Sequence, residues 1–132
     1  MIDLQNIHQN NWANTRVSIL GAGISGMAAA NLGRYVGVDI FISDKNNSPE
    51  VMEKLREFHH ETGEHSEKIL NTDLLIISPG IPDSIPIIQK CREGNIPIVS
   101  EIEFASWFTE SPILALTGSN GKTTTVNLLH EM

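Results

Sequence analysis

Short apolar runs alternate with amphipathic stretches along most of this chain. Runs of apolar residues, mainly valine, isoleucine and leucine, predict β-strands, and a weaker strand is expected at 61–65, where no such run occurs. The expected strands are 17–20, 38–42, 61–65, 74–78, 96–99 and 113–116, and the expected helices are 25–35, 49–59, 85–93, 102–108 and 123–132. This alternation is typical of β–α units around a parallel sheet. The pattern therefore predicts an α/β fold with a doubly wound, mainly parallel, Rossmann-like sheet.

Capping and helix-breaking residues divide the chain into segments. Ser48 is a good N-cap, Pro49 suits the first position of a helix, and Gly94 follows the third expected helix. The stretch 109–112 ends in proline and predicts a domain boundary. We therefore expect a loosely held N-terminal arm over 1–15, one Rossmann-like domain over 16–110, and the first strand, phosphate loop and helix start of a second domain over 111–132.

The most specific motif is Thr-Gly-Ser-Asn-Gly-Lys-Thr-Thr-Thr at 117–125, between the last expected strand and the last expected helix. At such a helix start, unpaired backbone N–H groups and the helix macrodipole favour a polyphosphate. Lys122 would add a positive charge, and the Thr123 hydroxyl would bind the Mg²⁺ that accompanies the nucleotide. The general phosphate-loop pattern has glycine where this chain has Leu116. The alternative is a glycine-rich turn with a surface lysine.

The sequence ends soon after this loop. A phosphate-loop strand needs parallel neighbours, and its Mg²⁺ needs an acidic ligand from another strand. We therefore expect further parts of the site downstream, and we expect the chain to be inactive in isolation. Because the strand at 113–116 would lack its sheet neighbours, we expect it to be mobile or to dock in a non-native place.

A second glycine-rich turn, Gly21-Ala22-Gly23-Ile24-Ser25-Gly26, follows the first expected strand. In this pattern the first glycine permits a tight turn, the second lets a pyrophosphate approach the backbone, and the third allows the helix to pack closely on the strand. Asp44 ends the next strand, where an acidic side chain meets a ribose or a base. NAD, FAD and nucleotide sugars all carry a pyrophosphate. The motif leaves the nucleotide open, and a turn that serves packing alone is the alternative.

A third turn, Ser78-Pro79-Gly80-Ile81-Pro82, follows the strand at 74–78. Ligands of open α/β sheets bind at the carboxyl ends of strands, so this turn is placed to form another lip of the same crevice. A rigid turn shaped by two prolines and a glycine explains these residues equally well.

Composition excludes several classes of function. The formal net charge is −7 and no run of lysine and arginine occurs, so we expect neither nucleic acid nor a membrane surface as a partner. The N-terminus lacks the pattern of a signal peptide, and no apolar run approaches the length of a membrane span. Cys91 is the single cysteine, which fits a packed free thiol in the reducing cytoplasm. We expect a monomer.

Other titratable residues carry weaker signals. His59, His60 and His65 lie in a polar stretch without the carboxylate or cysteine spacing of a ligand set, which favours a solvated helix end over a metal site. Glu101 and Glu103 lie at the start of a short helix. Capping or solvation explains these two residues as well as catalysis does.

The combination of four motifs resembles the Mur ligases of peptidoglycan synthesis. The motifs are the glycine turn at 21–26, Ser-Pro-Gly-Ile at 78–81, Ile-Val-Ser-Glu-Ile-Glu at 98–103 and the phosphate loop at 117–125. The resemblance covers nearly the whole chain after Arg16 but only the front of a three-domain enzyme. It implies that 16–110 binds the UDP part of the substrate and that 111–132 begins the ATP-binding central domain.

The resemblance also implies roles for single residues. The implied UDP-binding residues are Gly23, Ile24, Ser25 and Gly26 at the diphosphate and Asp44, Lys45 and Gly80 around the uracil and ribose. The implied ATP-binding residues are Gly118, Ser119, Asn120, Gly121, Lys122, Thr123 and Thr124. Among these, Lys122 would stabilise the transferring phosphate as the catalytic residue, and Thr123 would be the metal ligand for Mg²⁺. Lys45 occupies a position at which the family varies.

The residues of the motifs at 78–81 and 117–120 resemble those of the family branch that adds D-glutamate to UDP-N-acetylmuramoyl-L-alanine. The implied reaction phosphorylates the L-alanyl carboxylate with ATP, and the amino group of D-glutamate attacks the resulting acyl phosphate. Two other classes of function stay open. An NAD-dependent oxidoreductase domain would use Asp44 for the adenine ribose, and a non-catalytic module would sense a nucleotide.

Overall fold

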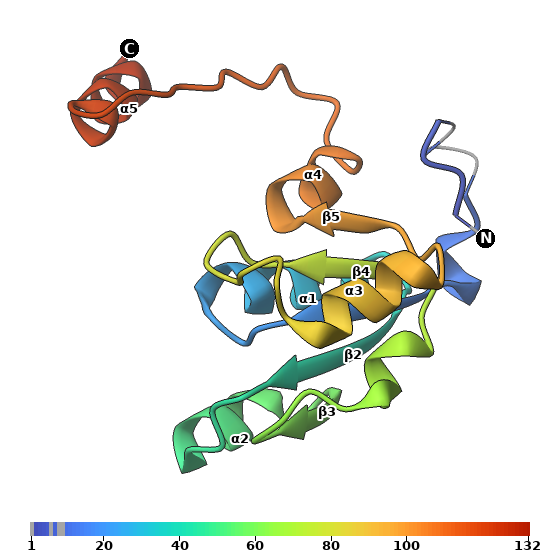
Figure 1. The fold of residues 1–132 in the computed structure, drawn as a ribbon. Helices are drawn as coiled ribbons and strands as arrows, with labels where there is room; N and C mark the ends of the chain where they lie inside the picture. Colours follow the sequence, from blue (N-terminus) through green and yellow to red (C-terminus); the bar gives the residue numbers. More distant parts are fainter. Residues whose placement is uncertain (1, 6, 8–9) are drawn as a thin grey trace.

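Five parallel strands form one sheet in the order β3-β2-β1-β4-β5 in this computed structural model, which describes residues 2–5, 7 and 10–132 (Figure 1). The strands are β1 (Arg16–Leu20), β2 (Asp39–Asp44), β3 (His59–Thr62), β4 (Leu74–Ile77) and β5 (Ile98–Ser100). The helices are η2 (Trp12–Asn14), α1 (Ile24–Tyr35), α2 (Pro49–Leu55), η3 (Glu67–Leu70), α3 (Pro86–Glu93), α4 (Glu101–Ser106) and α5 (Lys122–Glu131). The predicted doubly wound α/β fold is confirmed.

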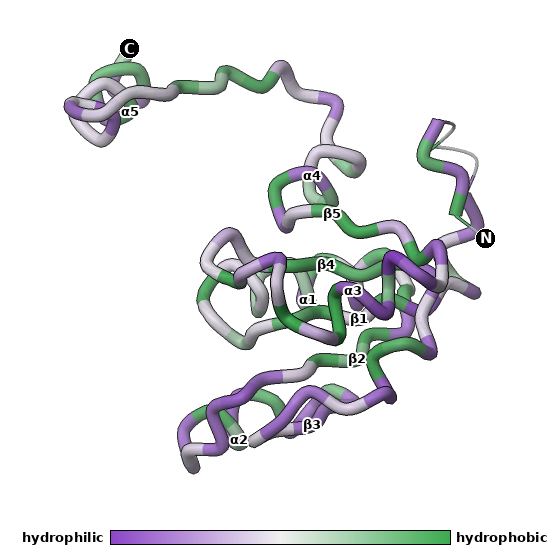
Figure 2. Tube along the Cα trace, viewed as in Figure 1, coloured by the Kyte–Doolittle hydropathy of each residue, from purple (hydrophilic) through white to green (hydrophobic). Residues whose placement is uncertain are grey.

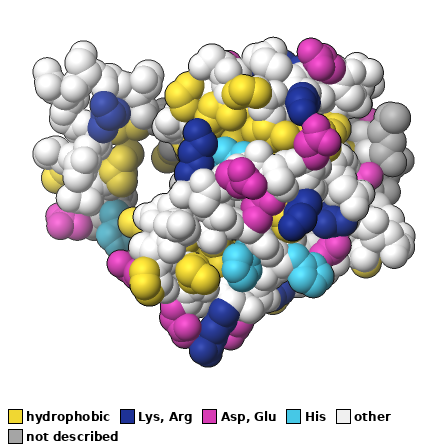
Figure 3. Space-filling view, turned by 60° about the horizontal axis from the view of Figure 1, so that its bottom comes forward, with side chains coloured by type: hydrophobic (Ala, Val, Ile, Leu, Met, Phe, Trp, Pro, Cys, Tyr) yellow, Lys and Arg dark blue, Asp and Glu magenta, His cyan; other side chains and the backbone are white. Residues whose placement is uncertain are grey.

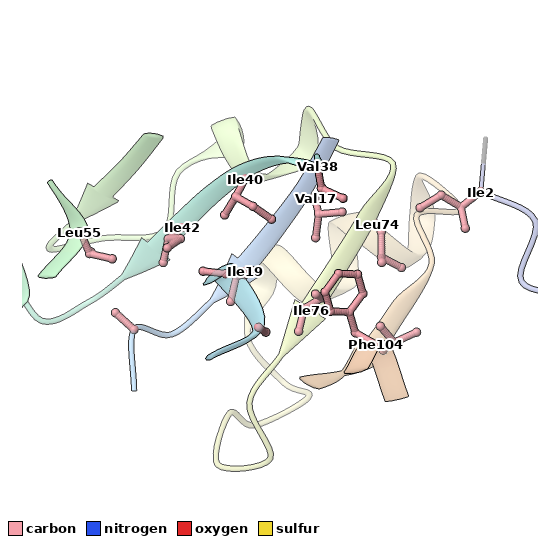
Figure 4. Close-up of a cluster of buried hydrophobic side chains, with 14 of the residues drawn as sticks. Ile2, Val17, Ile19, Val38, Ile40, Ile42, Leu55, Leu74, Ile76 and Phe104 are labelled. Atoms are coloured by element: carbon pink, nitrogen blue, oxygen red, sulfur yellow. The ribbon is translucent and has the colours of Figure 1, made fainter. Parts of the chain in front are cut away.

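Helices cover both faces of the sheet, which explains why its central strands are apolar on both sides. On one face α1, α2 and α4 enclose a core that includes Ile19, Ile76 and Phe104 (Figure 4). On the other face α3 and η3 pack over a second cluster that includes Leu20, Leu75 and Cys91. Burial raises the pKa of the Cys91 thiol, as expected for a packed free cysteine.

The strand pairing places the crevice of the sheet beside β1. Leu20 at the end of β1 lies opposite Ser43 of β2 on one side and Ile77 of β4 on the other. From β1 the chain proceeds through α1 to β2 and β3 on one side, and β4 and β5 lie on the opposite side. Because all five strands are parallel, the loops that follow β1 and β4 emerge next to each other at the carboxyl edge.

The expected caps hold, although some element boundaries differ from the prediction. The Ser48 hydroxyl accepts the Val51 N–H at 3.4 Å, and Pro49 begins α2. The prediction that this helix continues to 59 is wrong, because β3 begins there and pairs with β2. The strand expected at 61–65 therefore lies earlier, at 59–62, and the strand expected at 96–99 begins only at Ile98.

The C-terminal segment combines one confirmed element with one that does not form. Helix α5 is present, but 113–116 contains no strand, so the predicted strand is absent. This apolar stretch runs away from the sheet (Figures 1 and 2), and all residues from 109 to 132 are exposed. A strand needs a hydrogen-bonded neighbour, and the described residues provide none here, whereas a helix satisfies its backbone internally.

An aromatic cluster connects the beginning of the domain with its end. The ring of Trp12 stacks on Trp107 with a centroid distance of 5.8 Å and meets Phe104 and Phe108 edge-on at 6.1 and 5.2 Å. Ile2 is also buried, at 7% exposure. These contacts attach Ile2 and Trp12 to the face of the sheet that α4 covers.

The surface carries charges of both signs. On the face drawn in Figure 3, basic and acidic side chains intermingle. Exposed ion pairs of the molecule include Arg34–Glu57 and Lys54–Glu50. Throughout the described parts of the chain, no helix combines the length and the apolar character that crossing a membrane requires.

Helix α1 can approach β1 closely only because residue 26 is glycine. A Cβ atom at Gly26 would lie 2.1 Å from the backbone oxygen of Gly21, whereas one at Gly23 would have no neighbour within 4 Å. We predict that Gly26→Ala lowers the free energy of unfolding by at least about 2 kcal/mol through overpacking. The matched control Gly23→Ala should change it by less than about 0.5 kcal/mol. Urea denaturation measures both, and equal stability of the two variants would contradict this packing role.

Candidate nucleotide-binding site

The glycine turn after β1 has the geometry that its three glycines predict. Gly21 adopts a φ of 103°, which favours glycine, and its N–H donates to the Ser43 carbonyl at 2.9 Å. Gly26 allows close packing, as described above. Gly23 is exposed and has open space in front of it, so a ligand can approach the backbone at this position.

The start of α1 presents unpaired hydrogen-bond donors. The N–H groups of Ile24, Ser25 and Gly26 have no acceptor among the residues that the structure describes. The first turn contains no acidic residue, and the side chain of Ile24 is 96% exposed. Free donors combined with the positive end of a twelve-residue helix favour an anion such as a phosphate.

Asp44 supports the glycine turn from the neighbouring strand. Its Oδ2 accepts the Ala22 N–H at 2.6 Å, and its Oδ1 accepts the Asn46 N–H at 2.7 Å. This carboxylate therefore orients two backbone segments at the carboxyl end of β2. Lys45 follows it and is exposed. Sequence reasoning placed Asp44 at this edge but did not anticipate its contact with the glycine turn.

The turn after β4 lies directly against the glycine turn. The N–H of Ile81 donates to the Ser78 carbonyl at 3.0 Å and closes the turn. A Cβ built at Gly21 would lie 3.4 Å from the Ser78 hydroxyl, so the two loops are in contact. Gly80 is exposed, with no atom within 4 Å of the position that its Cβ would take. The predicted lip of the crevice is therefore in place.

A buried carboxylate lies behind both loops, and sequence reasoning gave it no special role. Glu101 is 5% exposed, and its Oε1 accepts hydrogen bonds from the Ser25 hydroxyl at 2.9 Å and from the Ser78 hydroxyl. Glu103 differs, because it is exposed and its N–H donates to the Ser100 hydroxyl that caps α4. The available signal was position, since Glu101 comes directly after a strand at the carboxyl edge.

The outer edge of the sheet contains a polar network around the buried Ser43. Its hydroxyl donates to Glu61 Oε1 at 2.7 Å, so the Nδ1–H of His65, at 2.8 Å, donates to the Ser43 oxygen. Burial raises the pKa of Glu61, but hydrogen bonds from Ser66 and Ser43 outweigh this effect and hold the pKa below its ordinary value. Burial, assisted by the charge of Lys45, lowers the pKa of His65.

The histidines do not end a helix, contrary to the prediction. His59 and His60 belong to β3, and His65 lies in the loop that follows it. Within the described part of the chain, no group of three or more His, Cys, Asp or Glu side chains is arranged to hold a metal ion.

The predicted phosphate loop at 117–125 lies apart from this edge of the sheet (Figure 1). Gly121 precedes α5 with a φ of 76°, and the Lys122 ammonium donates to the Gly118 carbonyl across the loop. No residue of α5 is buried. The structure thus brings the predicted UDP-binding residues to the carboxyl edge of the sheet, but it does not bring the predicted ATP-binding residues to that edge.

The fold and this crevice define a class of protein, namely a Rossmann-like α/β domain with a glycine loop at the switch point of its sheet. The family model for the Mur ligase MurD-like N-terminal domain matches residues 15–100. The chain belongs to this family.

Individual relatives agree with the family match. The chain is 46% identical over 122 residues to the UDP-N-acetylmuramoylalanine–D-glutamate ligase of Christiangramia forsetii. This match covers 89% of this chain and 27% of that ligase. The chain is 45% identical over 118 residues to the ligase of the same name from Chlorobaculum tepidum, and this match covers 87% of this chain and 25% of that ligase. The chain thus spans about a quarter of the length of these relatives.

A solved structure also resembles this chain. The UDP-N-acetylmuramate–alanine ligase MurC of Thermotoga maritima superposes with a TM-score of 0.57 at 25% identity, over 70% of this chain and 22% of that one. The fold of the domain is therefore found in a second Mur ligase.

The lowered pKa of His65 predicts a dependence of stability on pH. Because the folded chain binds this proton less readily than the unfolded chain, the free energy of unfolding should fall as the pH drops through the ordinary histidine value of 6.5. Glu61 should act in the same direction only at lower pH, near and below 4.5.

Urea denaturation between pH 5 and 8 tests this dependence. His65→Asn, which keeps a donor for Ser43, should flatten the slope near pH 6.5, whereas His130→Asn at an exposed position in α5 should leave it unchanged. An unchanged slope in His65→Asn would contradict the assignment.

Proposed function

We propose that this chain is the UDP-binding part of an ATP-dependent ligase that adds D-glutamate to UDP-N-acetylmuramoyl-L-alanine in peptidoglycan synthesis. One observation carries the proposal: the N–H groups of Ile24, Ser25 and Gly26 are unpaired at the start of α1, next to the exposed Gly23, in a chain of the MurD-like family. A diphosphate provides the acceptors that these donors lack. In this proposal 16–110 is the UDP-binding domain and 111–132 is the start of the ATP-binding domain.

The remaining crevice residues are suited to the nucleoside. Asp44 uses one lone pair of each carboxylate oxygen for the backbone, so each oxygen can still accept a hydrogen bond from a ribose hydroxyl or a base N–H. Lys45 follows Asp44, and Gly80 lies open on the opposite lip. We assign the uracil and ribose to the space around these three residues.

The residues of the loop at 117–125 are suited to an ATP polyphosphate. Apart from Lys122, which carries the positive charge, the ATP-binding residues in this proposal are Gly118, Ser119, Asn120, Gly121, Thr123 and Thr124. The start of α5 carries no acidic residue, and the Lys122 ammonium already reaches over the loop to Gly118. The Thr123 hydroxyl would contribute one ligand to Mg²⁺. ATP would supply the phosphoryl group that activates the substrate carboxylate.

Residues outside this chain are required for the complete reaction in this proposal. The L-alanyl carboxylate would be phosphorylated, and the D-glutamate amino group would attack the acyl phosphate to form an amide. The chain corresponds to about a quarter of its relatives, and its phosphate loop lies apart from the crevice. We therefore propose that the isolated chain binds the UDP compound without turning it over.

Calorimetric titration with UDP-N-acetylmuramoyl-L-alanine tests the proposal, with NAD titrated in parallel. We expect saturable binding of the UDP compound and none of NAD. Binding of NAD alone would instead support an oxidoreductase domain. If neither compound binds, the proposed function of this chain fails.

Two variants that each introduce one negative charge test where the diphosphate binds. Ile24→Glu adds a negative charge at the start of α1, where a carboxylate is compatible with the helix but repels a diphosphate, so the Kd should rise about tenfold or more. Tyr35→Glu adds the same charge at an 88% exposed position at the other end of the helix, about 16 Å away at 1.5 Å per residue. It should leave the Kd within about twofold, because this separation exceeds the screening length.

A further inference from the structure

Glu101 connects the two lips of the crevice through a single oxygen atom. Ser25 belongs to the first turn of α1, and Ser78 begins the turn after β4. Both hydroxyls donate to Oε1 of Glu101, which lies at the junction of β5 and α4. Elements separated by 76 and 23 positions in sequence therefore meet at one carboxylate.

Burial makes this contact costly to lose. The residue is 5% exposed, and a carboxylate in such a place must be satisfied by donors. The two serine hydroxyls are the donors that the structure gives to Glu101. If either loop moved away, the carboxylate would lose one of them, so its need for donors holds both loops in position.

The same bonds fix the direction of the two hydroxyl protons. A serine hydroxyl has one proton to donate, and in both residues it points to Glu101. A phosphate at the start of α1 would then be held by the backbone N–H groups rather than by the Ser25 hydroxyl. The carboxylate thus determines which donors of the glycine turn are available to an anion.

We propose that Glu101 is a positioning residue that clamps the glycine turn to the Ser78–Ile81 turn and so shapes the crevice for the UDP part of the substrate. This inference rests on the proposed function for the identity of the ligand. The clamp itself concerns the free protein and can be tested there.

Hydrogen exchange followed by NMR tests the clamp without ligand. In Glu101→Ala, the Ile81 N–H, which donates within the turn after β4, should exchange about tenfold faster or more. The Leu75 N–H, which bonds to the Pro97 carbonyl inside the sheet, serves as an internal reference for global unfolding. Glu103→Ala is the matched control, since Glu103 lies exposed in the same helix. Equal exchange at Ile81 in both variants, relative to Leu75, would overturn the clamp.

Binding of UDP-N-acetylmuramoyl-L-alanine gives the second readout. Glu101→Ala should raise the Kd about tenfold or more, the factor that corresponds to one hydrogen bond to a charged group. Glu101→Gln keeps an oxygen that accepts from both serines and should restore the Kd to within about threefold of the original. Failure of the glutamine variant to restore binding, with the fold intact by circular dichroism, would contradict a positioning role.

A double-mutant cycle separates the clamp from general destabilisation. Ser78→Ala should weaken binding in the original chain but have little further effect in Glu101→Ala, because the shared bond is already lost. Additive effects of the two substitutions would argue against the clamp. If the original chain does not bind the UDP compound, the proposed function fails, whereas the exchange experiment still decides whether the clamp exists.

Discussion

The parallel pairing of β1 with β2 on one side and β4 on the other is the constraint on which the site depends. It brings the ends of three strands to one edge, where Leu20 lies between Ser43 and Ile77. The chain leaves β1 through a glycine turn, and α1 then folds back over the sheet. Every group assigned to the proposed UDP site lies at a strand end, in a loop or at a helix start at this edge, and a shift in register would separate these groups.

The carboxylates near the proposed anion site of this acidic chain are already engaged in hydrogen bonds. The net charge is −7, and both Asp44 and Glu101 lie beside the glycine turn. Their oxygens accept hydrogen bonds from the Ala22 N–H and the Ser25 hydroxyl, so they orient the loops from behind. The N–H groups at the start of α1 are instead unpaired, and Gly23 beside them is exposed. The direction of local dipoles therefore matters more here than total charge.

The two glycine-rich loops differ in how much of their surroundings this chain supplies. The turn at 21–26 is supported by β1, β2, β4 and α4, and its geometry is complete. The loop at 117–125 is followed by a helix but follows no strand. A helix start can form locally because its hydrogen bonds are internal, whereas a strand needs a partner.

Local pattern in the sequence was enough to predict the order of the five strands and of helices α1 to α5, the tight turn at Gly21 and the close packing at Gly26. These features depend on periodicity and on backbone sterics over a few residues. The absence of a strand at 113–116, the end of α2 at Leu55 and the network of Ser43 with His65 required the tertiary structure. Glu101 is the clearest case, since it meets Ser25 across 76 positions. Which distant groups share one buried oxygen is decided by strand pairing and packing, and no local pattern in a single sequence records that choice.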